Sequence, residues 1–252
     1  MDNKRSPLKD KPLRQPGQSI QEQIDKIFED KVIPYILFPA FMFIFAVIEW
    51  VRFIYPSKPQ PIIATIIVLI SIAYCAPKII RVRREIVNLR LGSDGEKIVA
   101  QTLDDLRQDG CVILHDIIGD EFNVDHIVVS TKGIFVIETK TYSKPDKNSK
   151  VHFDGESKLE IDGIGDKSSV IDQVMANSKW IQEILKKSTG RIFNTRPVVL
   201  FPGWWTDSDS HKKVWVLEPK GLVKFIKNEK DNLPPEDVAL VVDRLSIHVR
   251  SQ

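Results

Sequence analysis

Two long apolar stretches stand out in the first third of the chain. Residues 33–48 and 61–76 contain no charged side chain. Each is shorter than the ~20 residues expected of a spanning helix, but flanking residues bring both to the lower limit of roughly 17. Their short connection contains two prolines, which favours a two-helix transmembrane hairpin over residues 32–77. The alternative is a pair of buried core helices. A cleaved signal peptide fits poorly, because a long polar stretch comes first and a second apolar run follows.

Basic residues lie on both sides of this hairpin, whereas the connection holds only Arg52 and Lys58. Positive charge stays on the cytoplasmic side, so we expect a cell-membrane protein with both termini in the cytoplasm. Residues 78–90 mix basic and apolar positions, as in a helix that lies along anionic lipid headgroups or in a solvated linker. The flanking basic residues are Lys4, Arg5, Lys9, Lys11, Arg14, Lys26 and Lys31 before the hairpin, and Lys78, Arg81, Arg83, Arg84 and Arg90 after it.

Beyond this linker, residues 91–252 alternate between helical and strand periodicity. A helix of residues 97–106, opened by a glycine-rich stretch, should stop at Gly110. The order helix, three strands, helix, two strands, helix predicts an α/β domain built around a mixed sheet flanked by helices. The other expected elements are strands over 112–118, 123–130, 134–139, 197–201 and 214–217, short strand-like pieces at 151–153 and 158–161, and helices over 168–187 and 234–249.

Composition limits the function more than it defines it. The 252 residues are 42% hydrophobic and 28% charged, enough for one sizeable domain plus a smaller part. A net charge of +2 argues against a protein that coats DNA by electrostatics alone. Cys75 and Cys111 have neither disulfide nor metal-site spacing, in keeping with a cytoplasmic domain.

Residues 1–31 are predicted to form a polar cytoplasmic tail, disordered before a short amphipathic piece near 20–28, and no activity is assigned to them.

Asp125, Glu138 and Lys140 lie in otherwise apolar strands. Ionised groups in such strands are stable only when they are paired or bind a metal. Residues 130–133 form a turn signal that makes the two strands a hairpin. With a two-residue turn at 131–132, Asp125 lies opposite Glu138, and Glu138 shares a face with Lys140. A bulge at Gly133 would shift this register by one.

The sequence resembles the nuclease-related domain (NERD) family of the PD-(D/E)XK nuclease-like superfamily over about residues 91–217. This resemblance implies a restriction-endonuclease-like fold. The motifs that carry it are Gly92-Ser93-Asp94-Gly95-Glu96, Asn123-Val124-Asp125-His126-Ile127-Val128-Val129, Gly133 to Tyr142, and Asp172-Gln173-Val174.

By this resemblance, Asp125 and Glu138 bind a divalent metal, with the Thr139 carbonyl as a further ligand. Oxygen ligands of this kind suit Mg2+ or Mn2+. Lys140 would orient the attacking water or help deprotonate it. Glu96 matches the acid on the family's first helix, and Gln173 matches a helix glutamine near the site.

Each signal has a simpler reading. The three strand residues also fit a structural ion-pair cluster in an inactive nuclease fold. Glu96, expected in a first helical turn, is favoured there by the helix dipole. A helix glutamine is often solvent-facing, and Asn177 stands where related nucleases often have an aromatic residue.

Histidines in strands are more often packed than catalytic, which applies to His115 and His126. Trp204 and Trp205 would stack on unpaired bases or, more simply, pack against the domain. Lys144, Lys147 and Lys150 would contact phosphates or lie in a solvated loop.

The sequence thus predicts a membrane-anchored, metal-dependent nuclease that acts on DNA. The alternative is an inactive nuclease-fold module that binds nucleic acid or a protein at the cytoplasmic membrane face.

Overall fold

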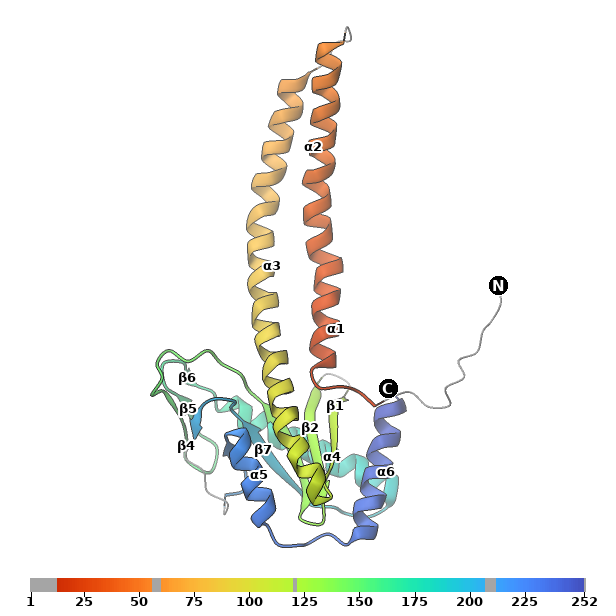
Figure 1. Cartoon of the computed structure of the whole chain (residues 1–252), viewed down its shortest axis with the longest axis vertical. Helices are drawn as coiled ribbons and strands as arrows, with labels where there is room; N and C mark the ends of the chain where they lie inside the picture. Colours follow the sequence, from red (N-terminus) through yellow and green to blue (C-terminus); the bar gives the residue numbers. More distant parts are fainter. Residues whose placement is uncertain (1–12, 56–59, 120–121, 207–211, 252) are drawn as a thin grey trace, which may run out of the picture. The chain divides into compact units, whose positions relative to one another are not determined.

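The computed structural model describes residues 13–55, 60–119, 122–206 and 212–251 (Figure 1). The chain divides into two compact units. One contains Ser19–Arg90, and the other combines Leu91–Gln252 with the N-terminal segment that ends at Gln18. Lys4, Arg5, Lys9 and Lys11 of the expected basic flank, and Lys58 of the connection, lie outside the described residues.

The first unit is helical. Two of its helices are long and apolar enough to cross a membrane. Most of their apolar side chains are exposed, for example Phe41 at 72% and Ile62 at 71%, unlike the core helices of a soluble domain. Ala46, Ala64 and Val68 pack together between α2 and α3. The elements are α1 (Gln18–Ile27), a π-helical turn (Phe28–Val32), α2 (Ile33–Ile54) and α3 (Pro61–Asp104), which continues into the second unit.

The helix start expected near residue 97 is wrong, because α3 is continuous from Pro61 to Asp104. Glu96 therefore lies far from the N-terminus of its helix, and the dipole explanation for an acid at this position does not apply. The expected stop is correct: a 3-10 turn (Asp105–Asp109) follows α3, and Gly110 ends it with a positive φ of 79°.

The second unit contains two mixed sheets. The larger has the strand order β1-β2-β3-β7-β9, with β1, β2 and β3 antiparallel and β3, β7 and β9 parallel. The smaller has the order β6-β5-β4-β8. The strands are β1 (Val112–Ile118), β2 (Asn123–Ser130), β3 (Gly133–Thr139), β4 (Lys150–Phe153), β5 (Leu159–Ile161), β6 (Gly165–Asp166), β7 (Thr195–Leu200), β8 (Trp205–Thr206) and β9 (Trp215–Leu217).

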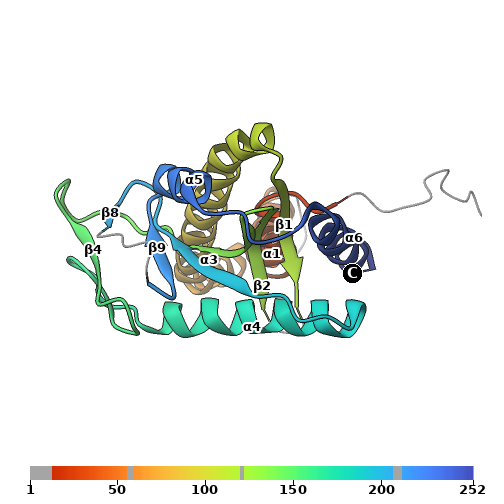
Figure 2. The same cartoon turned by 90° about the horizontal axis from the view of Figure 1, so that it is seen from below.

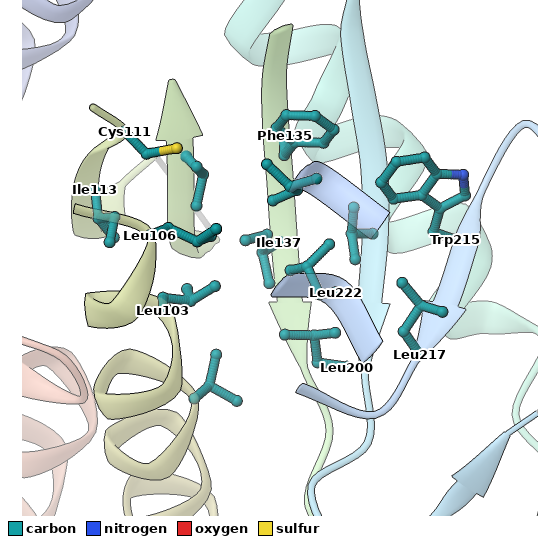
Figure 3. Close-up of a cluster of buried hydrophobic side chains, with 14 residues drawn as sticks. Leu103, Leu106, Cys111, Ile113, Phe135, Ile137, Leu200, Trp215, Leu217 and Leu222 are labelled. Carbon is teal, nitrogen blue, oxygen red and sulfur yellow. The ribbon is translucent and has the colours of Figure 1, made fainter. Parts of the chain in front are cut away.

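Helices cover both faces of the larger sheet. Figure 2 shows α4 (Ser169–Thr189) and α5 (Pro219–Asn228) on opposite sides of the strands. The face towards α5 packs Phe135, Ile137 and Trp215 against Leu222 and the last turns of α3 (Figure 3). The opposite face packs Val136 of β3 against α4 and α6 (Pro235–Ser251). Successive β3 residues thus face different helices, as the two-residue strand period requires.

The predicted fold class, a mixed α/β domain flanked by helices and preceded by two apolar helices, is confirmed. Ser130 pairs with Gly133, so the turn is Thr131–Lys132 and Gly133 forms no bulge. Continued by one step, this register sets Asp125 opposite Glu138. Helix α5 and strands β6 and β8 were not predicted, because they are short or carry little periodicity.

Candidate functional site

Glu138 lies near the end of β3, with its side chain turned towards α4. It is 3% exposed, and polar groups surround its carboxylate. Lys140 Nζ donates to Glu138 Oε1 over 2.7 Å, and Gln173 Nε2 donates to the same oxygen over 2.8 Å. Asn177 Nδ2 donates to Oε2 over 3.1 Å. Gln173 and Asn177 are four residues apart on α4, so both project from one face of the helix.

Asp125 approaches the same strand end from β2. Its Oδ2 accepts a 2.6 Å hydrogen bond from the Thr139 backbone N–H, the residue directly after Glu138. Asp116 of β1, across from Asp125, has a positive φ of 52°, uncommon for a residue other than glycine.

The distorted backbone at Asp116 interrupts the regular alternation of side chains between the two faces of the sheet, in both β1 and β2. Leu114 and Ile117 of β1 pack in the same apolar cluster although they are three residues apart, and so do Val124 and Ile127 of β2. A regular strand would turn such residues to opposite faces. The irregular backbone therefore lies at the acidic residues themselves.

Glu96 reaches the site from α3 and is 7% exposed. Its neighbour Gly95 fits tightly against the strand end, since a Cβ at this position would lie 1.8 Å from Thr141 Oγ1. The backbone N–H of Gly17, in the N-terminal segment, donates to the Glu96 carboxylate. Burial, followed by the charge of Asp116, raises the pKa of Glu96 to about 7.

The acidic groups interact electrostatically. Burial, followed by the charges of Glu138 and Glu96, raises the pKa of Asp125 well above its ordinary value. Burial also raises the pKa of Glu138, although Lys140 opposes this effect. Burial lowers the pKa of Lys140, but the charge and hydrogen bond of Glu138, together with the charge of Asp125, raise it overall, so this side chain is an ammonium at neutral pH. The structure thus brings together Glu96, Asp125, Glu138, Lys140 and Gln173.

The chemistry of these residues fits a hard divalent cation. Asp116 makes a 2.6 Å ion pair with Arg14, which leaves the other three carboxylates facing Lys140. Buried negative charge in excess of positive charge is costly without a counterion. Asp125 and Glu138 would hold the cation, with the Thr139 carbonyl beside them. Across residues 13–55, 60–119, 122–206 and 212–251, no three His, Cys, Asp or Glu side chains are arranged as a preformed cage. Mg2+ commonly binds through only one or two carboxylates and keeps several waters.

The histidines and tryptophans differ in their contacts and in their exposure to solvent. His115 and His126 share a 2.9 Å contact between their Nδ1 atoms, and burial lowers the pKa of each, consistent with packed, neutral rings. Trp204 is buried and donates to the Tyr142 carbonyl, whereas Trp205 is 66% exposed.

Lys144 and Lys147 join both tryptophans and Glu218 around an open concavity of about 440 Å³. Lys150 is the strand neighbour of Trp205.

Three residues at the site were not assigned there from the sequence. Asn177 was read only as a departure from the pattern of related nucleases, although its spacing from Gln173 places both on one helix face. Asp116, an acid within an apolar strand, carried the same signal as Asp125. Arg14 carried no such signal in the sequence, since it lies more than a hundred residues before its partner Asp116.

Fold and site together define a mixed α/β domain whose central strand ends in a cluster of carboxylates and a lysine. Residues 91–202 match the model of the family described as "Nuclease-related domain". This agrees with the PD-(D/E)XK-like superfamily and points to a nuclease-related function.

One similar protein is an uncharacterized protein of Bacillus anthracis. It is 39% identical over 56 residues, which cover 20% of this chain and 26% of the relative. The match thus extends over about a quarter of that protein's length. No solved structure matches the chain significantly.

Proposed function

We propose that this protein is a membrane-anchored, divalent-metal-dependent nuclease that hydrolyses DNA phosphodiester bonds. The observation that carries the proposal is the grouping of Asp125, Glu138 and Lys140 at one strand end, inside the segment that matches the nuclease-related family. A Mg2+ or Mn2+ ion bound there would polarise the phosphate and activate water.

The protein's own groups have separable roles. Asp125 and Glu138 supply oxygen ligands. Gln173 and Asn177 hold Glu138 in one orientation through hydrogen bonds to both of its oxygens. Lys140, as an ammonium, orients water and stabilises negative charge that develops on the phosphate.

A nucleic-acid strand would run from this site over the concavity beside Trp205. The wall formed by Trp204 is joined to the site by its hydrogen bond to Tyr142, two residues after Lys140. Lys144 and Lys147 offer positive charge for phosphates, and exposed Trp205 offers a flat apolar face for a base.

The two apolar helices would anchor the protein in the membrane, with the basic linker at residues 78–90 near anionic headgroups. The basic flanks favour a cytoplasmic position for the nuclease-related domain.

The test uses the full chain purified in detergent, with DNA and either Mg2+ or Mn2+. Lys140→Ala and Asp125→Asn should each lower the cleavage rate by roughly 10²-fold or more. Lys158→Ala, which removes a lysine that is 68% exposed, should leave the rate unchanged.

Equal cleavage by wild type and both site variants would identify a contaminating nuclease and reject the proposal. Salt-dependent DNA binding without cleavage in any divalent metal would instead identify a binding module.

A further inference from the structure

The N-terminal segment Leu13–Gln18 lies against the candidate site although the two apolar helices separate it from the rest of the domain in sequence. Arg14 Nε contacts Asp116 Oδ2 at 2.6 Å. Both side chains are largely removed from solvent, at 15% exposure for Arg14 and 4% for Asp116. Three residues later, the Gly17 N–H donates to the buried Glu96 carboxylate.

The backbone is shaped for this approach. Gly17 has a φ of +70° and lies so close to α3 that a Cβ would stand 2.9 Å from Ser93 Oγ. Asp116 itself adopts the left-handed conformation. The close fit of Gly17 against Ser93 and the uncommon conformation of Asp116 indicate a specific docking of the segment.

The ion pair between Arg14 and Asp116 also offsets part of the negative charge of the acidic residues at the site. Glu96, Asp116, Asp125 and Glu138 bring four carboxylates, and Lys140 and Arg14 bring two cations. With all four acids ionised, two negative charges remain, which equals the charge of one divalent cation. Arg14 thus places a positive charge against the buried Asp116 carboxylate beside Glu96.

We propose that Leu13–Gln18 completes the nuclease site, with Arg14 as a positioning residue. Arg14 anchors the segment through Asp116, and the anchored segment presents the Gly17 amide, which fixes Glu96 beside the metal ligands. The inference rests on the proposed function. It means that the site combines residues from before and after the two apolar helices, and that a fragment starting at Leu91 lacks part of it.

The test measures Mn2+ binding to the full chain in detergent by calorimetry. Arg14→Ala should weaken binding roughly 10-fold or more, as is typical when a residue that orients metal ligands is lost. Arg14→Lys, which keeps the charge, should recover most of the affinity. The matched control is Arg191→Ala, since Arg191 forms an ion pair with Asp237 outside the site.

Asp116→Asn provides a second route if Arg14→Ala folds poorly, because asparagine tolerates a positive φ and removes the buried charge. It should also weaken Mn2+ binding. The Arg14→Ala/Asp116→Asn double variant should lose no more Mn2+ affinity than the single variant that binds Mn2+ more weakly. Hydrogen exchange of residues 15–18 should accelerate in the Arg14 and Asp116 variants and stay unchanged in Arg191→Ala.

The two claims fail differently. If wild type binds Mn2+ and Arg14→Ala binds it equally well, only the role of the segment is overturned. If wild type binds no Mn2+, the proposed function falls, and the role of the segment falls with it.

Discussion

At the residue scale, Gly95 controls how closely α3 approaches the end of β3. Its missing side chain leaves room for Thr141, and Glu96 is the next residue along the helix. The absence of a side chain at Gly95 therefore helps to set the position of the Glu96 carboxylate.

Gly95→Ala should destabilise the domain by about 1–3 kcal/mol, because the added Cβ would overlap Thr141 Oγ1. Urea unfolding followed by tryptophan fluorescence measures the change. Gly221→Ala in α5 is the control: its Cβ would meet Leu217 at 3.9 Å, an ordinary contact, so the variant should gain up to about 1 kcal/mol from helix propensity. Equal stability of both variants would contradict the predicted overlap.

His115 makes a pH-dependent contribution to stability. Burial lowers its pKa in the folded state to about 4, whereas in the unfolded chain it stays near 6.5. Between these values the unfolded state binds more protons, so stability falls as the pH drops from 7 to 5.

His115→Gln should therefore lose less stability between pH 7 and pH 5 than wild type, by about 1–2 kcal/mol after solvent screening. Contributions from the acidic cluster are common to both proteins and cancel in this difference. His152→Gln, which replaces an exposed histidine, should not reduce the loss in this way. Parallel pH profiles for wild type and His115→Gln would refute the prediction.

At the element scale, short segments with little sequence periodicity shape the proposed nucleic-acid surface. Strand β8 has only two residues, yet it exposes Trp205 next to Lys150 of β4. Trp204, directly before it, is buried and fixes the segment by its hydrogen bond to Tyr142. Neighbouring tryptophans thus have different roles, one in packing and one at the surface.

Trp205→Ala should weaken binding of single-stranded DNA, measured by anisotropy in EDTA to prevent cleavage. Loss of one stacking contact, worth about 1–3 kcal/mol, corresponds to a roughly 5- to 150-fold higher Kd. Ile192→Ala removes a side chain that is 77% exposed and should leave the Kd unchanged. An unaltered Kd for Trp205→Ala would exclude base stacking at this position.

At the scale of the whole molecule, the contact between Arg14 and Asp116 constrains the topology of the proposed membrane anchor. Residues before and after the two apolar helices form one compact unit, so the proposed membrane anchor must leave both flanks on the same side of the membrane. An even number of spans satisfies this requirement, and a single span does not.

Reporters fused to the N-terminus and to the C-terminus should therefore give the same sidedness, and the basic flanks predict that both are cytoplasmic. Alkaline phosphatase and green fluorescent protein fusions in bacterial cells distinguish the two sides. Opposite sidedness of the two ends would rule out the hairpin, and two extracytoplasmic ends would rule out only the orientation.

The sequence by itself determined the features set by neighbouring residues. The register of the β2–β3 hairpin follows from its two-residue turn and strand period, so the relation of Asp125, Glu138 and Lys140 was predictable. The apolar helices and most strands were likewise evident from local patterns. The separate helix start near residue 97 was wrong, because a glycine-rich stretch that usually interrupts a helix is accommodated within α3 by packing.

Only the tertiary structure decided which distant residues join that hairpin. Asn177 meets Glu138 because α4 crosses the face towards which Glu138 points, and Arg14 meets Asp116 across a hundred residues. Such contacts depend on how packed elements bring sequence-remote side chains together, and local periodicity carries no record of them. The acids and the lysine at the strand end, together with Gln173, were therefore predicted from the sequence, whereas Asn177, which also orients Glu138, and the Arg14–Asp116 pair were not.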